Sequence, residues 1–145
     1  SCSDWKKFFL NFFSSAVLGF EKPAFNLHYT MFRDAIEVWG TPEQDKYWKE
    51  MLKTNAIFGT YIQTEIGHGT YLRGLETTAT YDKSTQEFIL DSPTLTSIKF
   101  WPGSSAKSSN YAIVMAKLIV DEKDCGIHAF IVQLRSLETH KLVPG

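Results

Sequence analysis

Near residue 56 the spacing of apolar residues changes from a helical to a strand-like period. The earliest apolar positions recur at three- and four-residue intervals, which is typical of a helix with one buried face. These positions are Trp5, Phe8, Phe9, Phe12, Phe13, Ala16, Val17 and Phe20. Lys6, Lys7, Asn11 and Ser14 lie off this stripe, and the apolar run is shorter than a membrane span. The pattern therefore predicts an amphipathic core helix and no membrane span.

Two further helices follow from periodicity and from start signals. One apolar stripe consists of Phe25, His28, Tyr29, Phe32, Ile36 and Trp39. Gly40 can end that helix, and its stripe places His28 on the helix surface or at the edge of the core. Thr41, Pro42 and Gln44 then supply an N-cap hydroxyl, a proline at the first helical position and a capping-box glutamine. A third helix is predicted from this point through Leu52.

From residue 56 onward, segments rich in Thr, Val, Ile and aromatic residues predict strands. They cover residues 57–63, 75–81, 87–90, 94–101, 111–120 and 127–134. Residues 82–85 and 121–124 have the composition of hairpin connections, and residues 104–110 form a longer polar loop that is mobile or ordered by a ligand. Because helices precede strands without alternation, we predict an α+β fold with N-terminal helices followed by an antiparallel, barrel-like sheet.

Composition excludes several classes of function. The chain has 145 residues, 43% of them hydrophobic, which suits one average globular domain. Fifteen basic and sixteen acidic residues give a net charge of −1, so we expect no nucleic-acid partner. Cys2 and Cys125 are far apart, and no histidine or cysteine spacing indicates a metal site.

A glycine-containing loop between two predicted strands is the first candidate for binding. Gly67 and Gly69 flank His68, and glycine can adopt backbone conformations that are closed to other residues and can approach a ligand closely. Thr64 and Thr70 supply hydroxyls on either side. The next glycine is Gly74, so the dinucleotide-binding fingerprint is not met. Taken alone, the pattern is also that of a simple connection between strands.

Residues 59–81, 88–103 and 128–132 closely resemble the corresponding strings of the acyl-CoA oxidases, peroxisomal flavoproteins of the acyl-CoA dehydrogenase superfamily. The resemblance is strong over residues 59–145, weaker over 23–55 and faint before them. It implies that residues 1–55 are part of an N-terminal helical domain and residues 56–145 an incomplete middle β-barrel domain. In that family FAD lies between the barrel and a C-terminal helical domain.

The same resemblance implies a set of cofactor contacts. Those residues are Tyr61, Ile62, Gln63, Thr64, Gly69, Thr70 and Gly103. Gln63 and Thr64 would meet the flavin ring system through backbone and hydroxyl groups, and Gly103 would meet it from the next strand end. Trp101 is either a flat wall for the ring or an aromatic residue of the barrel core.

Other polar residues near this loop have two interpretations each. Glu65 is interpreted as a hydrogen-bond acceptor that orders the loop rather than as a catalytic base, since the family's catalytic glutamate belongs to the C-terminal domain. We therefore expect no catalytic residue in this chain. His68 can exchange protons near neutral pH, but a single histidine decides nothing. Arg73 and residues 104–110 either contact phosphates of FAD or coenzyme A or form a solvated loop.

The resemblance implies a segment of a FAD-dependent oxidase that converts fatty acyl-CoA to trans-2-enoyl-CoA and reduces oxygen to hydrogen peroxide. It also implies peroxisomal β-oxidation, a homodimer in the full-length form, and an isolated 145-residue chain without turnover. Two alternatives stay open. One is an acyl-CoA dehydrogenase that uses a protein electron acceptor, and the other is a catalytically silent, oxidase-like binding or regulatory protein.

Overall fold

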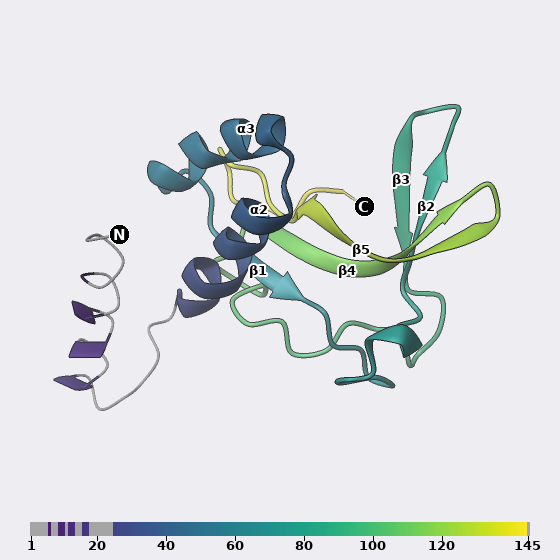
Figure 1. The fold of residues 1–145 in the computed structure, drawn as a ribbon, viewed down its shortest axis with the longest axis horizontal. Helices are drawn as coiled ribbons and strands as arrows, with labels where there is room; N and C mark the ends of the chain where they lie inside the picture. The colour runs from purple at the N-terminus through teal and green to yellow at the C-terminus, as the bar shows by residue number, and fades with distance from the viewer. Residues whose placement is uncertain (1–5, 7–8, 11, 14–15, 18–24, 145) are drawn as a thin grey trace.

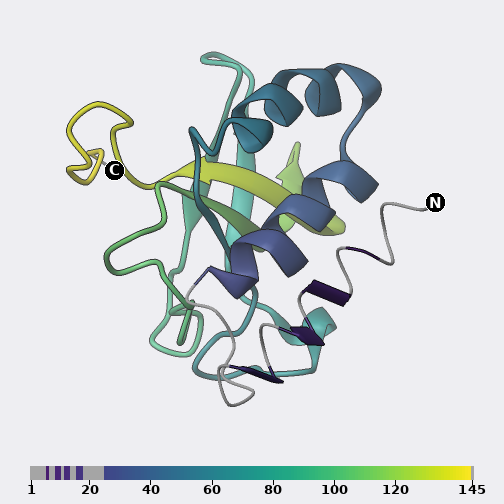
Figure 2. The ribbon, with the colours of Figure 1, turned by 90° about the vertical axis from the view of Figure 1, so that its left-hand side faces the viewer.

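The computed structural model describes residues 6, 9–10, 12–13, 16–17 and 25–144, and it confirms an α+β fold (Figure 1). The helices of residues 28–53 lie together on one side of a five-stranded sheet (Figure 2). Among the described residues, no helix is long and apolar enough to cross a membrane. The architecture thus agrees with helices followed by strands.

The predicted first helix is only partly described. Its described residues are helical, but Phe9, Phe12, Phe13 and Val17 are 53%, 56%, 58% and 70% exposed. Trp5, Phe8 and Phe20 lie outside the described residues. For the described positions the prediction of a core helix is wrong, because their apolar stripe is not buried against the rest of the fold.

A π-helical turn, η1 (His28–Phe32), runs directly into α2 (Arg33–Trp39). Gly40 ends α2 as predicted, with its N–H donating to the carbonyl of Ile36 at 3.0 Å. The predicted surface or core-edge position of His28 is wrong, since the ring is only 2% exposed. It packs between the rings of Phe32 and Phe58, and its Nδ1 accepts a hydrogen bond from the N–H of Gly59 at 3.0 Å.

The start of α3 (Pro42–Lys53) confirms the capping box read from the sequence. The N–H of Gln44 donates to the Thr41 hydroxyl at 3.3 Å, and the Gln44 side chain accepts from the N–H of Thr41 at 2.9 Å. Two N–H groups that a helix start leaves without helical partners are thereby satisfied. The local signal fixes where α3 begins.

The sheet is mixed rather than antiparallel. Its strands are β1 (Gly59–Ile62), β2 (Thr78–Asp82), β3 (Glu87–Asp91), β4 (Tyr111–Val120) and β5 (Lys123–Gln133). β4 pairs in parallel with β1 and with β2, whereas the β2–β3 and β4–β5 pairs are antiparallel. The antiparallel pairs are joined by the two predicted hairpins; the parallel pairs are joined by long connections, as parallel pairing requires. Closure into a barrel stays a prediction, because the sheet formed by the described strands is open.

The predicted strand at 94–101 is wrong. Among the described residues this segment forms one isolated bridge, between Lys99 and Glu65, and a few backbone hydrogen bonds to residues 64–67, but no continuous strand. The N–H of Thr94 donates to the Ser97 hydroxyl at 2.9 Å, and that hydroxyl donates to the Thr94 carbonyl at 2.7 Å. Ser and Thr side chains that bond nearby backbone favour turns over ladders. The segment is therefore a series of turns.

The core lies between the helices and the sheet. It contains Phe32, Ala35, Ile36, Leu52, Ile57, Leu75, Ile113 and Met115. Gly59 allows the closest approach within it, because a Cβ at this position would lie 2.1 Å from the ring of Phe32. This contact seats η1 directly on β1. A second small cluster joins Ile62 to Ala112 and Val114.

Candidate functional site

A hollow of about 320 Å³ lies where β1 ends and the segment 100–103 passes beside it. It is lined by Leu27, Met31, Tyr61, Gln63, Thr64, Phe100, Trp101, Pro102 and Gly103. The structure thus brings together four of the predicted contact residues, namely Tyr61, Gln63, Thr64 and Gly103, from two segments that are far apart in the sequence. Tyr61 is tied to this wall by a 3.0 Å hydrogen bond from its hydroxyl to the Gln63 side chain.

The other predicted contact residues do not line the hollow. Ile62 is buried with Ala112 and Val114, as its alternation with Tyr61 and Gln63 along the strand requires. Gly69 and Thr70 are exposed on the loop that leads to the short 3-10 helix η2 (Leu72–Gly74), where Arg73 is also exposed. Gly69, Thr70 and Arg73 therefore follow the lining residues Gln63 and Thr64 closely in the sequence, but they do not line the hollow.

The two loop glycines do not adopt the conformations expected of them. Among the described glycines, only Gly126 has a positive φ. Gly67 is needed for close packing, since a Cβ there would lie 2.8 Å from Cβ of Thr96. Gly69 has nothing within 4 Å of such a Cβ. The glycine requirement in the folded chain therefore falls on Gly67 and comes from packing rather than from a left-handed backbone.

Glu65 orders this loop, which confirms its interpretation as an acceptor. Its carboxylate, which is 0% exposed, accepts hydrogen bonds from the N–H groups of Glu76 at 2.7 Å and Thr77 at 2.9 Å, and from Lys99 Nζ at 3.0 Å. Burial alone would raise the pKa of Glu65, but the hydrogen bonds from Glu76, Thr77 and Lys99 outweigh it and lower that pKa. The group is thus held as a carboxylate, which suits an anchor.

Trp101 stands at the rim of the hollow rather than in a core. Its side chain is 77% exposed, its φ is 46°, and its ring stacks on Phe100 with centroids 6.0 Å apart. The interpretation as a barrel-core aromatic is therefore wrong for this chain. Beside it, the Gly103 carbonyl accepts a hydrogen bond from the buried hydroxyl of Thr60. A flat apolar ring thus lies next to hydroxyl and backbone groups held in fixed positions, an arrangement that suits a planar heteroaromatic ligand.

His68 has a structural partner. Its Nε2 lies 3.3 Å from the carboxylate of Glu76, which also accepts hydrogen bonds from the hydroxyls of Thr94 at 2.5 Å and Thr96 at 2.7 Å. These bonds, those of Thr94 and Thr96 foremost, lower the pKa of Glu76 to about 2. The cluster fastens the glycine loop to the turns that precede Lys99.

Sequence reasoning missed Arg135, which orders the loop 104–110. The guanidinium is 7% exposed and donates to the carbonyls of Ser105 at 2.6 Å, Ala106 at 2.6 Å and Ser109 at 2.7 Å. His140 adds a 2.6 Å contact from Nε2 to the Lys107 carbonyl. The loop is thus ordered by the protein itself. A lone arginine after a strand carries no sequence signal for this role.

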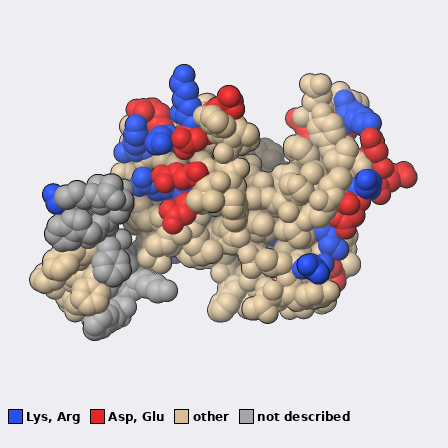
Figure 3. Space-filling model, in the orientation of Figure 1, with Lys and Arg blue, Asp and Glu red and all other residues tan. Residues whose placement is uncertain are grey.

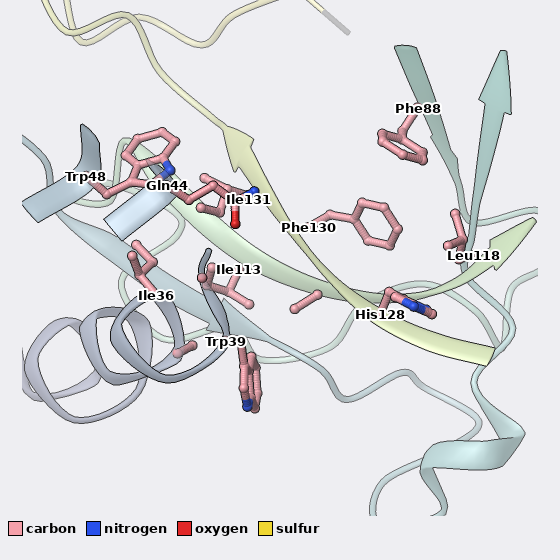
Figure 4. A pocket seen from close by; sticks show the side chains of 13 residues that line it. Ile36, Trp39, Gln44, Trp48, Phe88, Ile113, Leu118, His128, Phe130 and Ile131 are labelled. Atoms are coloured by element: carbon pink, nitrogen blue, oxygen red, sulfur yellow. The ribbon is translucent and has the colours of Figure 1, made fainter. Parts of the chain in front are cut away.

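A larger hollow of about 410 Å³ lies elsewhere, between the helices and β5 (Figure 4). Its walls are mostly apolar, with Gln44 and His128 among the polar residues, and none of the predicted contact residues lines it.

Charged side chains gather on the helices and along the hairpins, with a largely uncharged surface between them (Figure 3). No group of metal-ligating side chains occurs in the part of the chain that the structure describes.

The arrangement of helices packed on a mixed sheet is shared with solved acyl-CoA oxidase structures. Acyl-CoA oxidase 1 of Arabidopsis thaliana matches with a TM-score of 0.81 and 51% identity, over 83% of this chain and 18% of that one. Acyl-CoA oxidase-1 of Caenorhabditis elegans, solved in complex with FAD and ATP, matches with a TM-score of 0.81 and 48% identity, over 84% of this chain and 19% of that one.

Sequence comparison gives the same family. Residues 4–58 match the family model described as acyl-coenzyme A oxidase N-terminal. Peroxisomal acyl-coenzyme A oxidase 1 of Bos taurus is 55% identical over 129 residues, which are 89% of this chain and 19% of that protein. The chain therefore belongs to the acyl-CoA oxidase family. It spans about a fifth of the length of the curated relatives it matches.

Proposed function

We propose that this chain forms part of the FAD site of an acyl-CoA oxidase. The observation that carries the proposal is the hollow at the end of β1, where Tyr61, Gln63, Thr64 and Gly103 meet beside the exposed ring of Trp101. The relative from C. elegans that was solved with FAD supports the choice of cofactor. Among the described residues the Thr64 hydroxyl has no hydrogen-bond partner, so it is available to a ligand.

The reaction proposed for the whole enzyme is the conversion of fatty acyl-CoA to trans-2-enoyl-CoA in peroxisomal β-oxidation. FAD, when bound, would supply the hydride acceptor and the means of reducing molecular oxygen to hydrogen peroxide. In this chain, Thr64 and nearby backbone groups would bond the polar edge of the ring system, and Trp101 would exclude water from one face. Ile62, Gly69 and Thr70 complete the proposed contact set, the last two from the loop beyond the hollow.

We propose that residues 1–55 belong to the N-terminal helical domain and residues 56–145 to the middle β-domain of a homodimeric oxidase. The change from helices to strands after α3 supports this division. None of the contact residues is assigned a catalytic role, since the proposed base lies in the C-terminal domain. The relatives named above are called oxidases, which favours oxygen over the protein electron acceptor of a dehydrogenase.

FAD titration of the 145-residue chain tests this proposal. We expect quenching of flavin fluorescence and a shifted visible absorption band on binding. Thr64→Val should weaken binding by roughly three- to tenfold, because one hydrogen bond to the ring is lost. Thr80→Val, on the exposed face of β2, is the matched control and should bind as the wild type does. A folded wild-type chain that leaves FAD unbound, or a Thr64→Val variant equal to the control, would contradict the proposal.

A further inference from the structure

The hollow depends on two segments that are held together by few backbone bonds. The N–H of Phe100 donates to the carbonyl of Thr64 at 2.9 Å. Two more bonds, of 3.0 Å and 2.9 Å, join Ile66 to Ile98 and Gly67 to Thr96. Such a short ladder leaves the spacing of its two segments weakly determined by backbone bonding alone.

Lys99 joins both segments to the centre of the sheet. Its ammonium donates to the carbonyl of Gln63 at 3.0 Å, to the carboxylate of Glu65 at 3.0 Å and to the carbonyl of Met115 at 2.7 Å. An ammonium has three donor hydrogens, so these acceptors use all of them. The side chain is 13% exposed, and it is absent from the lining of the hollow. Its charge is therefore directed into the protein and away from a bound ring.

Glu65 fixes the other end of the ion pair. Its buried carboxylate is held by the N–H groups of Glu76 and Thr77, in the segment that leads into β2. Removing Lys99 would leave this carboxylate buried without its cation and would leave two carbonyls without a donor, and each of these losses is costly. The pair thus resists separation of the segments it joins.

We propose that Glu65 and Lys99 are positioning residues for the flavin, and that their ion pair sets the spacing between Gln63 with Thr64 on one side of the hollow and Trp101 with Gly103 on the other. This inference rests on the proposed FAD site. Neither residue touches the ligand in this arrangement. They act by holding both walls of the hollow against β4.

The test compares Lys99→Met with two controls in the full 145-residue chain. Lys83→Met breaks the exposed pair of Lys83 with Asp121, and Leu52→Ala destabilises the core under α3. At saturating FAD, Lys99→Met should alter the visible circular dichroism of the bound flavin and weaken its binding by about tenfold or more. Both controls should keep the wild-type flavin spectrum. A Lys99→Met spectrum identical to that of Leu52→Ala would overturn the proposal.

Amide hydrogen exchange separates this inference from the proposed function. In Lys99→Met the N–H groups of Ile66, Gly67 and Phe100 should exchange about tenfold faster or more than in Leu52→Ala. If the wild type binds no FAD, the proposed function fails, and the exchange rates alone then test the role of the Glu65–Lys99 pair. Equal exchange rates in Lys99→Met and Leu52→Ala would overturn that role. Should Lys99→Met not fold, Glu65→Gln, which keeps the shape and removes the charge, takes its place with the same expected results.

Discussion

At the scale of single residues, buried polar side chains fix the geometry around the site. Within the described part of the chain, every buried side-chain nitrogen or oxygen has a hydrogen-bond partner. His28 and Asn110 accept from the N–H groups of Gly59 and Phe58, which are 31 and 52 positions away in the sequence. A single sequence shows the residue types but not such distant partners, which is why the burial of His28 and the role of Arg135 could not be predicted.

Gly59→Ala gives a prediction at this scale. The added methyl group would lie 2.1 Å from the ring of Phe32, so η1 or β1 must shift. We expect a loss of about 1–3 kcal/mol in the free energy of unfolding, measured by urea denaturation. Gly69→Ala is the control, because nothing lies within 4 Å of the added group, and its effect should stay within about 0.5 kcal/mol. Equal losses in both variants would contradict the packing argument.

At the scale of elements, the accuracy of the sequence predictions follows the range of the interactions. The start of α3 was predictable because its signal lies within four consecutive residues, and the bounds of β4 agree with the predicted 111–120. The parallel pairs of β4 were not predictable, because they join segments far apart along the chain. Residues 94–101 have the composition of a strand, but the hydroxyls of Thr94 and Ser97 bond nearby backbone instead.

Thr41→Ala tests the contribution of the capping box to α3. The substitution removes the acceptor for the N–H of Gln44, and we expect a loss of about 1 kcal/mol in the free energy of unfolding. Thr41→Ser keeps the hydroxyl and should remain close to the wild type. Thermal or urea unfolding followed by far-ultraviolet circular dichroism measures both. A Thr41→Ser loss as large as that of Thr41→Ala would show that the hydroxyl is not the cause.

At the scale of the whole molecule, the resemblance to the acyl-CoA oxidases predicted the contact residues, and the structure shows which of them lie together. Tyr61, Gln63, Thr64 and Gly103 share a hollow, whereas Gly69 and Thr70 lie on the exposed loop. Spacing along the chain could not make this distinction, because it depends on how the loop is fastened by Glu65 and Glu76. The carboxylates of Glu65 and Glu76 thus fix the position of the glycine loop relative to the rest of the fold.

Those carboxylates and His28 make stability depend on pH in one direction. Burial, aided by Arg33, lowers the pKa of His28 below 6.5, so its contribution is present above about pH 6.5 and is lost as the pH falls. The pKa values of Glu65 and Glu76 are lowered from 4.5, that of Glu76 to about 2, so their contributions are present above pH 4.5 and are lost as the pH falls further. We expect urea midpoints to decrease steadily from pH 7 towards pH 3.

Two variants test which residues cause this decrease of the urea midpoint with falling pH. His28→Asn keeps a hydrogen-bond acceptor but does not titrate, so it should flatten the part of the decrease that begins below about pH 6.5. Glu76→Gln should flatten it below about pH 4.5. A wild-type profile that is flat from pH 7 to 3 would contradict the assignment.

The partner strands of β4 change along one of its edges. β1 pairs as far as Val114, and β2 begins to pair at Lys117. Between them the carbonyl of Met115 receives the ammonium of Lys99 instead of a strand N–H. The sheet therefore divides along this edge of β4, and the side chain of Lys99 lies at the point of division. One part of the sheet consists of β1, which lies beneath η1, and the other consists of the β2–β3 hairpin. Both parts pair with β4, and the side chain of Lys99 joins them at the point where the pairing changes.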